Sequence, residues 1–292
     1  MKYQKKNLTF VLILSLKISS MGNSVKRVLF VNSEITPYLP ESEIANIGRY
    51  LPQGIQERKK EIRSFMPRYG CINERKNQLH EVIRLSGMNI VINEVDRPLV
   101  IKVASISAAR MQVYFIDNED YFHRKSIYHD ADGNFFKDNG ERAIFFARGV
   151  LETVKKLRWA PDVIHCQGWI SHILPLYLKK AYIDDPIFSN SKVVLSLYND
   201  ISTEQFPEDL KDKVLFGGVT EQDVEILKEA NGINLAKLAA NYSDGIIFGA
   251  DGIDPELKAY CEKSGLPTLE YNAEAVGNGS YIEDYNSFYD QL

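Results

Sequence analysis

Three short segments of the chain carry polar and aromatic side chains directly after apolar runs of strand type. The segments are Asn32–Glu43, Cys166–Trp169 and Tyr198–Asp200. Hydroxyl, carboxylate, amide, imidazole and aromatic groups can bind a polar ligand through hydrogen bonds and ring stacking. The candidate ligand residues are Ser33, Glu34, Tyr38, His165, Gln167, Trp169, Tyr198 and Asn199.

Several of these residues also have a structural interpretation. His165 is either a hydrogen-bonded core histidine or a cleft residue, and Trp169 either stacks on a ligand ring or packs against the next helix. Glu34 is either a ligand contact or a partner of the N-cap of the following helix. Cys166 directly follows His165, and neighbouring strand residues point to opposite faces, so the pair is no nucleophile and base. We therefore assign no catalytic residue.

The sequence gives no support for a metal or a cofactor. Cys71, Cys166 and Cys261 are far apart, which excludes a zinc spacing and a disulfide framework. The segment Asp130–Asn134, with Glu141 at the twelfth place, imitates a calcium loop, but Phe135 stands where that loop needs glycine. We expect no metal and no cofactor.

Apolar runs and amphipathic stretches alternate along most of the chain. Val28–Val31 is a continuous apolar run with β-branched residues, which is typical of a buried parallel strand. The other expected strands are Ile62–Met66, Asn89–Asn93, Leu99–Ser105, Gln112–Ile116, Asp162–His165, Lys192–Leu197, Gly245–Phe248 and Pro267–Tyr271. The expected helices are Glu41–Arg58, Asn139–Trp159, Ile170–Tyr182, Leu235–Tyr242 and Pro255–Lys263.

Strand–helix alternation at this spacing implies right-handed crossovers. It predicts an α/β fold, a Rossmann-like and mostly parallel sheet flanked by helices, with any ligand at the carboxyl edge of that sheet. The strands between residues 89 and 116 lack long helices between them and predict an added meander or hairpin. Pro52 should kink or split its helix. Asp138 and Glu141 predict a capping box at the start of the helix that follows them.

Composition and charge narrow the class of protein. The 292 residues are 45% hydrophobic and 25% charged, which is ordinary for a globular protein. The net charge of −4 and the absence of a long basic run argue against a nucleic-acid partner. The cysteine content fits the cytoplasm, and the apolar run Leu8–Leu16 is too short to span a bilayer.

We expect three segments. Residues 1–24 form an N-terminal extension, which is either untranslated sequence upstream of a start at Met21 or a signal-like segment of a secreted protein. Residues 25–270 form the α/β domain. Residues 271–292 form a tail, in which the spacing of Ile282, Tyr285, Phe288 and Tyr289 predicts a docking helix or a cover over the face of a second lobe.

Several motifs in order resemble the N-terminal lobe of bacterial glycogen synthases and plant starch synthases. The resemblance covers roughly Val25 to Lys263. The motifs are Ser33-Glu34 with Pro37, Leu51-Pro52, Met66–Gly70, Val113–Asp117, Tyr128-His129, Asp138-Asn139 with Glu141-Arg142, Pro161–Cys166 with Trp169, and Leu174–Lys179. The family implies a two-lobed glycosyltransferase of GT-B type that moves glucose from ADP-glucose to the 4-hydroxyl of an α-1,4-glucan with retention. This chain resembles only the first lobe, whereas the second would supply most of the nucleotide pocket.

The chain departs from the family at all three loops. The family's Lys-x-Gly-Gly is here Pro40-Glu41-Ser42-Glu43, so carboxylates replace a cation and bare backbone beside the expected diphosphate. Two unit charges ~4 Å apart interact by about 4 kcal/mol at an effective dielectric of ~20, so this reversal of sign is large. In the second loop, the family's Asp-Trp-His is replaced by Gly168-Trp169-Ile170. In the third loop, the family's His-Asn is replaced by Tyr198-Asn199.

Two hypotheses of different class follow. The first is a glycogen/starch synthase-like glucosyltransferase that is inactive alone, with ADP-glucose or α-glucan as its ligand. The second is a non-catalytic module that binds a glucan or a nucleotide sugar, or regulates a complete synthase. A variant of the first is a split synthase, in which a protein partner supplies the second lobe. We expect neither a nucleic-acid nor a membrane partner.

Overall fold

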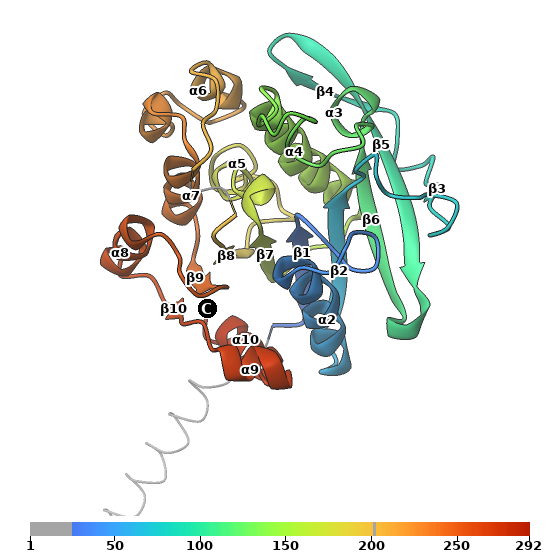
Figure 1. Ribbon diagram of the computed structural model, residues 1–292, viewed down its shortest axis with the longest axis vertical. Coiled ribbons are helices and arrows are strands. Elements are labelled where there is room, and N and C mark those ends of the chain that lie inside the picture. Colours follow the sequence, from blue (N-terminus) through green and yellow to red (C-terminus); the bar gives the residue numbers. More distant parts are fainter. Residues whose placement is uncertain (1–24, 201–202) are drawn as a thin grey trace, which may run out of the picture.

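The computed structural model describes residues 25–200 and 203–292, so our expectations for residues 1–24 lie outside the described residues (Figure 1). The strands are β1 (Arg27–Asn32), β2 (Glu61–Pro67), β3 (His80–Glu81), β4 (Met88–Ile92), β5 (Val95–Ile106), β6 (Met111–Asp117), β7 (Val163–Gln167), β8 (Lys192–Leu197), β9 (Gly245–Phe248) and β10 (Thr268–Leu269). The α-helices are α2 (Glu43–Glu57), α3 (Glu119–Phe122), α4 (Asn139–Leu157), α5 (Leu174–Lys180), α6 (Leu210–Val214), α7 (Gly232–Asn241), α8 (Pro255–Lys263), α9 (Ala273–Asn278) and α10 (Tyr281–Asp290). The 3₁₀ turns are η1 (Ser107–Ala109), η2 (Trp169–Ser171) and η3 (Glu225–Lys228).

The strands form one twisted, mostly parallel sheet. Its order is β10-β9-β8-β7-β1-β2-β6-β5-β3, and β4 pairs with β5. The strands from β10 to β6 run parallel, whereas β5 is antiparallel to β6, β3 and β4. This arrangement confirms the expected fold class and the expected meander. It also places the ends of β1, β7 and β8, and hence the three candidate loops, on one edge.

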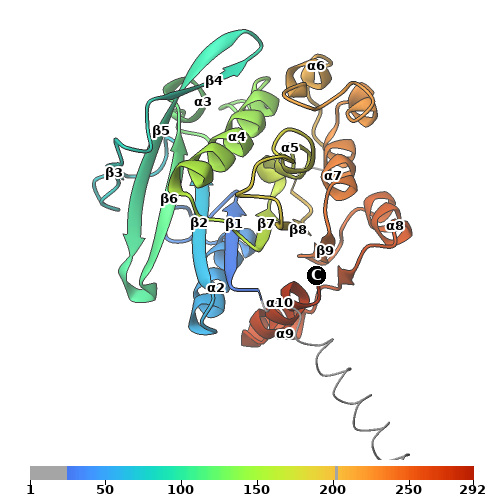
Figure 2. The same ribbon diagram turned by 180° about the vertical axis from the view of Figure 1, so that it is seen from behind.

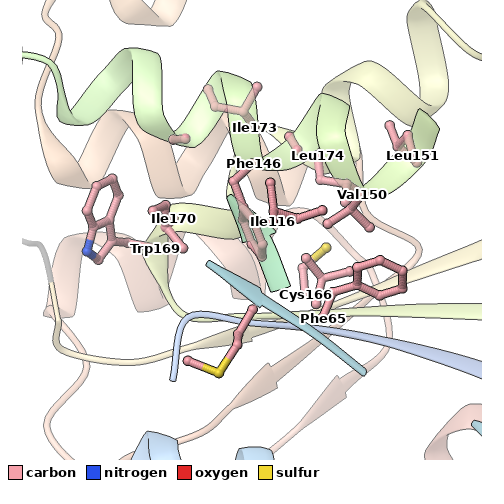
Figure 3. Close-up of a cluster of buried hydrophobic side chains, with 14 of the residues drawn as sticks. Phe65, Ile116, Phe146, Val150, Leu151, Cys166, Trp169, Ile170, Ile173 and Leu174 are labelled. Carbon is pink, nitrogen blue, oxygen red and sulfur yellow. The ribbon is translucent and has the colours of Figure 1, made fainter. Parts of the chain in front are cut away.

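Helices cover both faces of the sheet (Figures 1 and 2). On one face, α4, α5, α7 and α8 pack their apolar side chains onto the larger hydrophobic core. Figure 3 shows Phe146 and Val150 of α4 among Phe65, Ile116 and Cys166 of the strands. The helical spacing of apolar residues in α4 therefore buries one stripe of that helix against the sheet.

The opposite face is covered by α2 and by the two C-terminal helices. Val163, Val194 and Ile247 of β7, β8 and β9 form a second core with Phe288 and Tyr289 of α10. The helix expected from the apolar spacing near the C-terminus is thus α10, and it packs on the sheet. Within residues 25–200 and 203–292, we find no helix with the length and apolar character needed to cross a bilayer.

The structure corrects two expected helices. Pro52 lies inside α2 without splitting it, because α2 runs continuously from Glu43 to Glu57. The expected helix Ile170–Tyr182 is divided into η2 and α5. Pro175 lies in the first turn of α5, where proline favours a helix start over continuation from an earlier turn.

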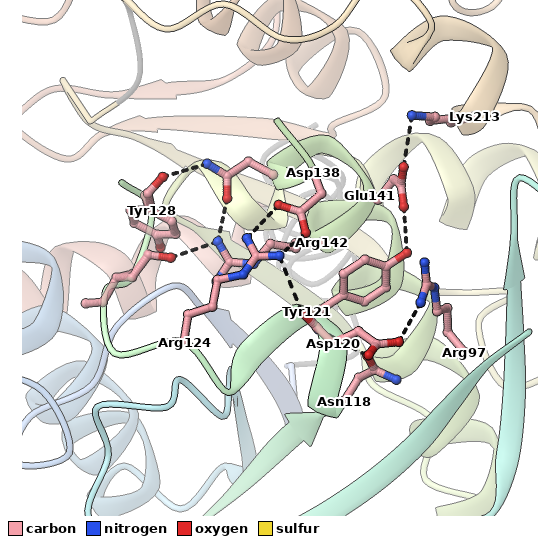
Figure 4. A network of polar contacts seen from close by, with 12 residues as sticks. Arg97, Asn118, Asp120, Tyr121, Arg124, Tyr128, Asp138, Glu141, Arg142 and Lys213 are labelled. Carbon is pink, nitrogen blue, oxygen red and sulfur yellow. Dashed lines mark hydrogen bonds and ion pairs between the residues drawn. The ribbon is translucent and has the colours of Figure 1, made fainter. Parts of the chain in front are cut away.

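The capping box expected at α4 is also absent. Asp138 occupies the N-cap position but makes no side-chain cap hydrogen bond, because Arg124 Nη1 donates to its Oδ1 at 2.7 Å. Glu141 accepts a hydrogen bond from the Tyr121 hydroxyl at 2.8 Å and pairs with Lys213 Nζ at 2.9 Å (Figure 4). Long-range ion pairs therefore use the two carboxylates that the local pattern assigned to the helix terminus.

Candidate functional site

The loop between β1 and α2 folds back onto the first turn of α2. Ser42 is the N-cap of that helix, and its Oγ accepts a hydrogen bond from Ala45 N at 3.0 Å. The same hydroxyl donates to Glu34 Oε2 at 2.9 Å. Gly48 of α2 allows the backbone of the loop to lie close to the helix, since a Cβ at Gly48 would lie 2.4 Å from the Glu34 carbonyl oxygen. Glu34 therefore has the role of cap partner that was one of its two interpretations.

The Glu34 carboxyl group is partly withdrawn from water. Burial raises its pKa, and the hydrogen bond from Ser42 offsets only part of that effect. Burial of the Glu34 carboxyl group thus disfavours its charged form.

The second and third loops meet at Gly168. This glycine has φ +80°, and a Cβ on it would lie 2.0 Å from Ser33 Oγ, so a side chain at this position would displace Ser33. Trp169 N donates to Asp200 Oδ2 at 2.9 Å, which joins the turn after β7 to the loop after β8. Burial raises the pKa of Asp200 to about 7, and the nearby Glu34 adds to that shift.

The Trp169 ring is packed on all sides. It is 1% exposed, and its ring contacts Tyr128, Phe135 and Phe206 with centroid distances of 4.9, 5.6 and 5.9 Å. In this arrangement the ring stabilises the loop segments around it and offers no open face to a ligand.

His165 lies beneath α10, away from the carboxyl edge. Its Nε2 is 2.6 Å from Ser196 Oγ, and its Nδ1 is 2.8 Å from the Tyr289 hydroxyl. The side chain is fully buried, and burial lowers its pKa to about 3, so the imidazole is neutral. This geometry is that of the hydrogen-bonded core histidine.

The remaining candidates are spread around the same edge. Tyr38 is 7% exposed, and its ring stands edge-on to Phe115 at 4.9 Å. Gln167 Nε2 donates to the Ile44 carbonyl at 2.9 Å, which fixes α2 to β7. Tyr198 lies against Gly249, where a Cβ would come within 2.6 Å of its ring, and Asn199 is exposed.

The structure thus brings together only part of the predicted set. Ser33, Glu34, Gln167 and the Trp169 backbone meet where β1 and β7 end. His165 is separated from them because it points to the face that α10 covers. The structure gives His165 its structural interpretation, and a ligand role for the other candidates stays a prediction.

Two residues of the site were missed. Ser42 carries a recognisable signal, because serine directly before a helix that starts with glutamate is a strong N-cap pattern. Asp200 has no local signal, since its role depends on the position of the turn after a strand that lies 31 residues earlier in the chain. In the part of the chain that the structure describes, no three His, Cys, Asp or Glu side chains are grouped to hold a metal ion.

Comparison with known proteins agrees with this fold. The family model of the starch synthase catalytic domain matches residues 27–257. The glycogen synthase of Chlorobium phaeobacteroides is 35% identical over 275 residues, which covers 91% of this chain and 55% of that protein. The glycogen synthase of Pelodictyon phaeoclathratiforme is 38% identical over 273 residues, again covering 91% of this chain and 55% of that protein.

A solved structure has the same fold. The catalytic domain of starch synthase IV from Arabidopsis thaliana, bound to ADP and acarbose, superposes with a TM-score of 0.64 at 14% sequence identity. The superposition covers 87% of this chain and 52% of that chain. The chain spans about half the length of the curated relatives it matches. Because the family model matches most of the chain and these relatives share more than 30% of their aligned residues with it, this chain belongs to the starch synthase catalytic domain family.

Proposed function

We propose that this chain is a glycogen/starch synthase-like glucosyltransferase lobe that takes part in α-glucan synthesis in the cytoplasm. ADP-glucose and α-1,4-glucan are the ligand classes that its relatives suggest. We further propose that the chain alone does not transfer glucose from ADP-glucose. The support for the first statement is family membership, and the support for the second is the local chemistry at α2.

One observation carries the proposal of inactivity. The N-terminus of α2, where backbone N–H groups would meet a diphosphate, is occupied by the Ser42 hydroxyl and bordered by Glu34. Ser42 Oγ already accepts the N–H of Ala45, so that donor is not available to phosphate. Glu41 in the loop and Glu43 in the first turn of α2 are exposed and add negative charge.

The test is a transfer assay with radiolabelled ADP-glucose and glycogen. We expect no incorporation above a boiled control. Turnover that is lost in Glu34→Gln or Tyr198→Phe would contradict the proposal, because it would mean that the altered loops still hold a reactive donor.

A second candidate function is that of a non-catalytic glucan-binding or regulatory module. Carboxyl, hydroxyl and amide groups meet at the carboxyl edge, and they suit the hydroxyls of a neutral sugar better than they suit a diphosphate. Calorimetry with maltoheptaose, ADP-glucose and ADP separates the candidates. Heat from maltoheptaose alone favours the binding module, whereas silence from all three favours a protein partner, which co-purification from native lysate would identify.

A further inference from the structure

A groove with polar and apolar lining residues lies at the amino edge of the sheet, opposite to the three loops. It is formed where β2 and β6 begin and where α2 ends, and its volume is about 640 Å³. Arg63, Arg110, Gln56, Gln112, Ser105 and Trp159 are among its lining residues. A cavity of this size accommodates a small metabolite. The groove has no part in the proposed function.

Arg63 is held rigidly in the wall of this groove. Its Nη1 donates to the Tyr114 hydroxyl at 2.5 Å, and its guanidinium carbon lies 5.6 Å from the Tyr114 ring centroid and 5.2 Å from that of Trp159. Its Nε is buried and makes no hydrogen bond to any described residue. The two rings fix the guanidinium plane in the wall of the groove.

The other charges of the groove are already neutralised. Lys60 Nζ pairs with Asp290 Oδ1 at 2.7 Å. Glu61 Oε2 accepts from Trp159 Nε1 at 3.1 Å and from Arg27 Nε at 3.3 Å.

Two guanidinium groups remain without such compensation. Neither Arg63 nor Arg110 forms an ion pair within residues 25–200 and 203–292. The side chain of Arg110, on an exposed residue at φ +51°, has no polar partner among them either. The groove thus carries an excess of two positive charges, from one rigid and one movable guanidinium.

We propose that this groove binds a phosphate monoester of a small sugar. Two guanidinium groups in the lining of one groove can bind the oxygens of a phosphate dianion through charge-assisted hydrogen bonds. Gln56 and Gln112 present amides and Ser105 a hydroxyl, and these groups suit the hydroxyls of an attached sugar. The groove is distinct from the N-terminus of α2, which lies at the carboxyl edge of the sheet.

The test is calorimetry of the full chain with ribose 5-phosphate, and with inorganic phosphate, ribose and gluconate as comparisons. We expect ribose 5-phosphate to bind at least about tenfold more tightly than ribose, and the affinity to fall as salt is added. Arg63→Gln and Arg110→Asn should each weaken binding roughly tenfold. Arg75→Gln, which removes an exposed arginine outside the groove, should leave the affinity unchanged.

Three results would overturn the proposal. The first is that ribose 5-phosphate does not bind, and the second is that both groove variants bind it as tightly as the parent. The third is that gluconate binds with equal affinity, which would show that the groove does not select phosphate. If Arg63→Gln does not fold, Arg110→Asn decides the matter, because the Arg110 side chain has no polar partner in the described structure. Asparagine also tolerates the left-handed backbone at that position.

Discussion

At the scale of single residues, a few side chains act together to fix the loops of the candidate site. Ser42 closes the N-terminus of α2 with its hydroxyl and holds Glu34 beside it. Gly168 leaves room for Ser33, and Asp200 supplies a carboxyl group that accepts the Trp169 N–H. These contacts hold the three loops against one another.

The cap at α2 should contribute measurably to stability. We expect Ser42→Ala to lower the free energy of unfolding by about 1 kcal/mol, because Ala45 N loses its partner and Glu34 loses its donor. Urea denaturation measures this difference, with Ser126→Ala as the control at an exposed position. Equal losses in the two variants would show that the hydroxyl does not cap the helix.

Asp200 should make stability depend on pH. Its pKa of about 7 in the folded chain lies above the ordinary value of 3.8, so the folded state retains a proton that the unfolded state releases. Stability contributed by this group is therefore lost as pH rises from about 4 to about 7. We expect Asp200→Asn to be more stable than the parent at pH 7.5 and close to it at pH 4.5.

Urea denaturation at both pH values tests this expectation. Asp96→Asn, at an exposed position, should differ from the parent by the same amount at the two pH values. A pH-independent difference for Asp200→Asn would mean that Asp200 is ionised across this range.

At the scale of elements, α10 completes the fold. It covers Val163, Val194 and Ile247, which would otherwise leave half of one sheet face exposed to water. It also provides the only described partner of His165 Nδ1, the Tyr289 hydroxyl at 2.8 Å. The tail is therefore part of the hydrophobic core.

Removing α10 should unfold the chain. Burial of a large apolar side chain contributes about 1.5–3 kcal/mol, so losing Tyr285, Phe288 and Tyr289 together costs a large share of a domain's ~5–15 kcal/mol. We expect a chain ending at residue 280, which lacks only α10 and the two residues after it, to be aggregated or molten by size exclusion and near-UV circular dichroism. A monomeric, cooperatively folded product would contradict this role.

A milder variant tests the hydrogen bond alone. Tyr289→Phe keeps the ring and should cost about 1–3 kcal/mol, because it leaves the buried His165 Nδ1 unpaired. Tyr50→Phe, in which the ring is 51% exposed, is the matched control and should change the free energy of unfolding by less than about 0.5 kcal/mol. Indistinguishable denaturation curves for the two variants would argue against the Tyr289–His165 bond.

Elements were easier to predict from the sequence than contacts. The apolar run Val28–Val31 identified β1, and the stripe in Asn139–Trp159 identified α4, because burial of one face leaves a periodic pattern. The prediction that Asp138 caps α4 was wrong, because Arg124 donates to the same carboxylate. Likewise, His165 could not be placed from sequence, because its partner Tyr289 is 124 residues away.

At the scale of the whole molecule, the two edges of the sheet present different side chains. The carboxyl edge holds Glu34 and Asp200 beside a capped helix, and the amino edge holds Arg63 and Arg110 in an open groove. The uncompensated cations should favour anions at the amino edge. Our central claim is that the family's donor position at α2 is closed to a diphosphate.

Titration with ADP-glucose tests this claim most directly. Calorimetry compares the parent loop with a restored loop that combines Pro40→Lys, Ser42→Gly and Glu43→Gly. Both chains also carry Arg63→Gln and Arg110→Asn, so that the amino-edge groove does not contribute to binding. We expect no measurable heat from the parent loop and detectable binding by the restored loop. Equally tight binding by both would contradict the account, because it would show that Ser42, Glu34 and Glu43 leave the diphosphate position open.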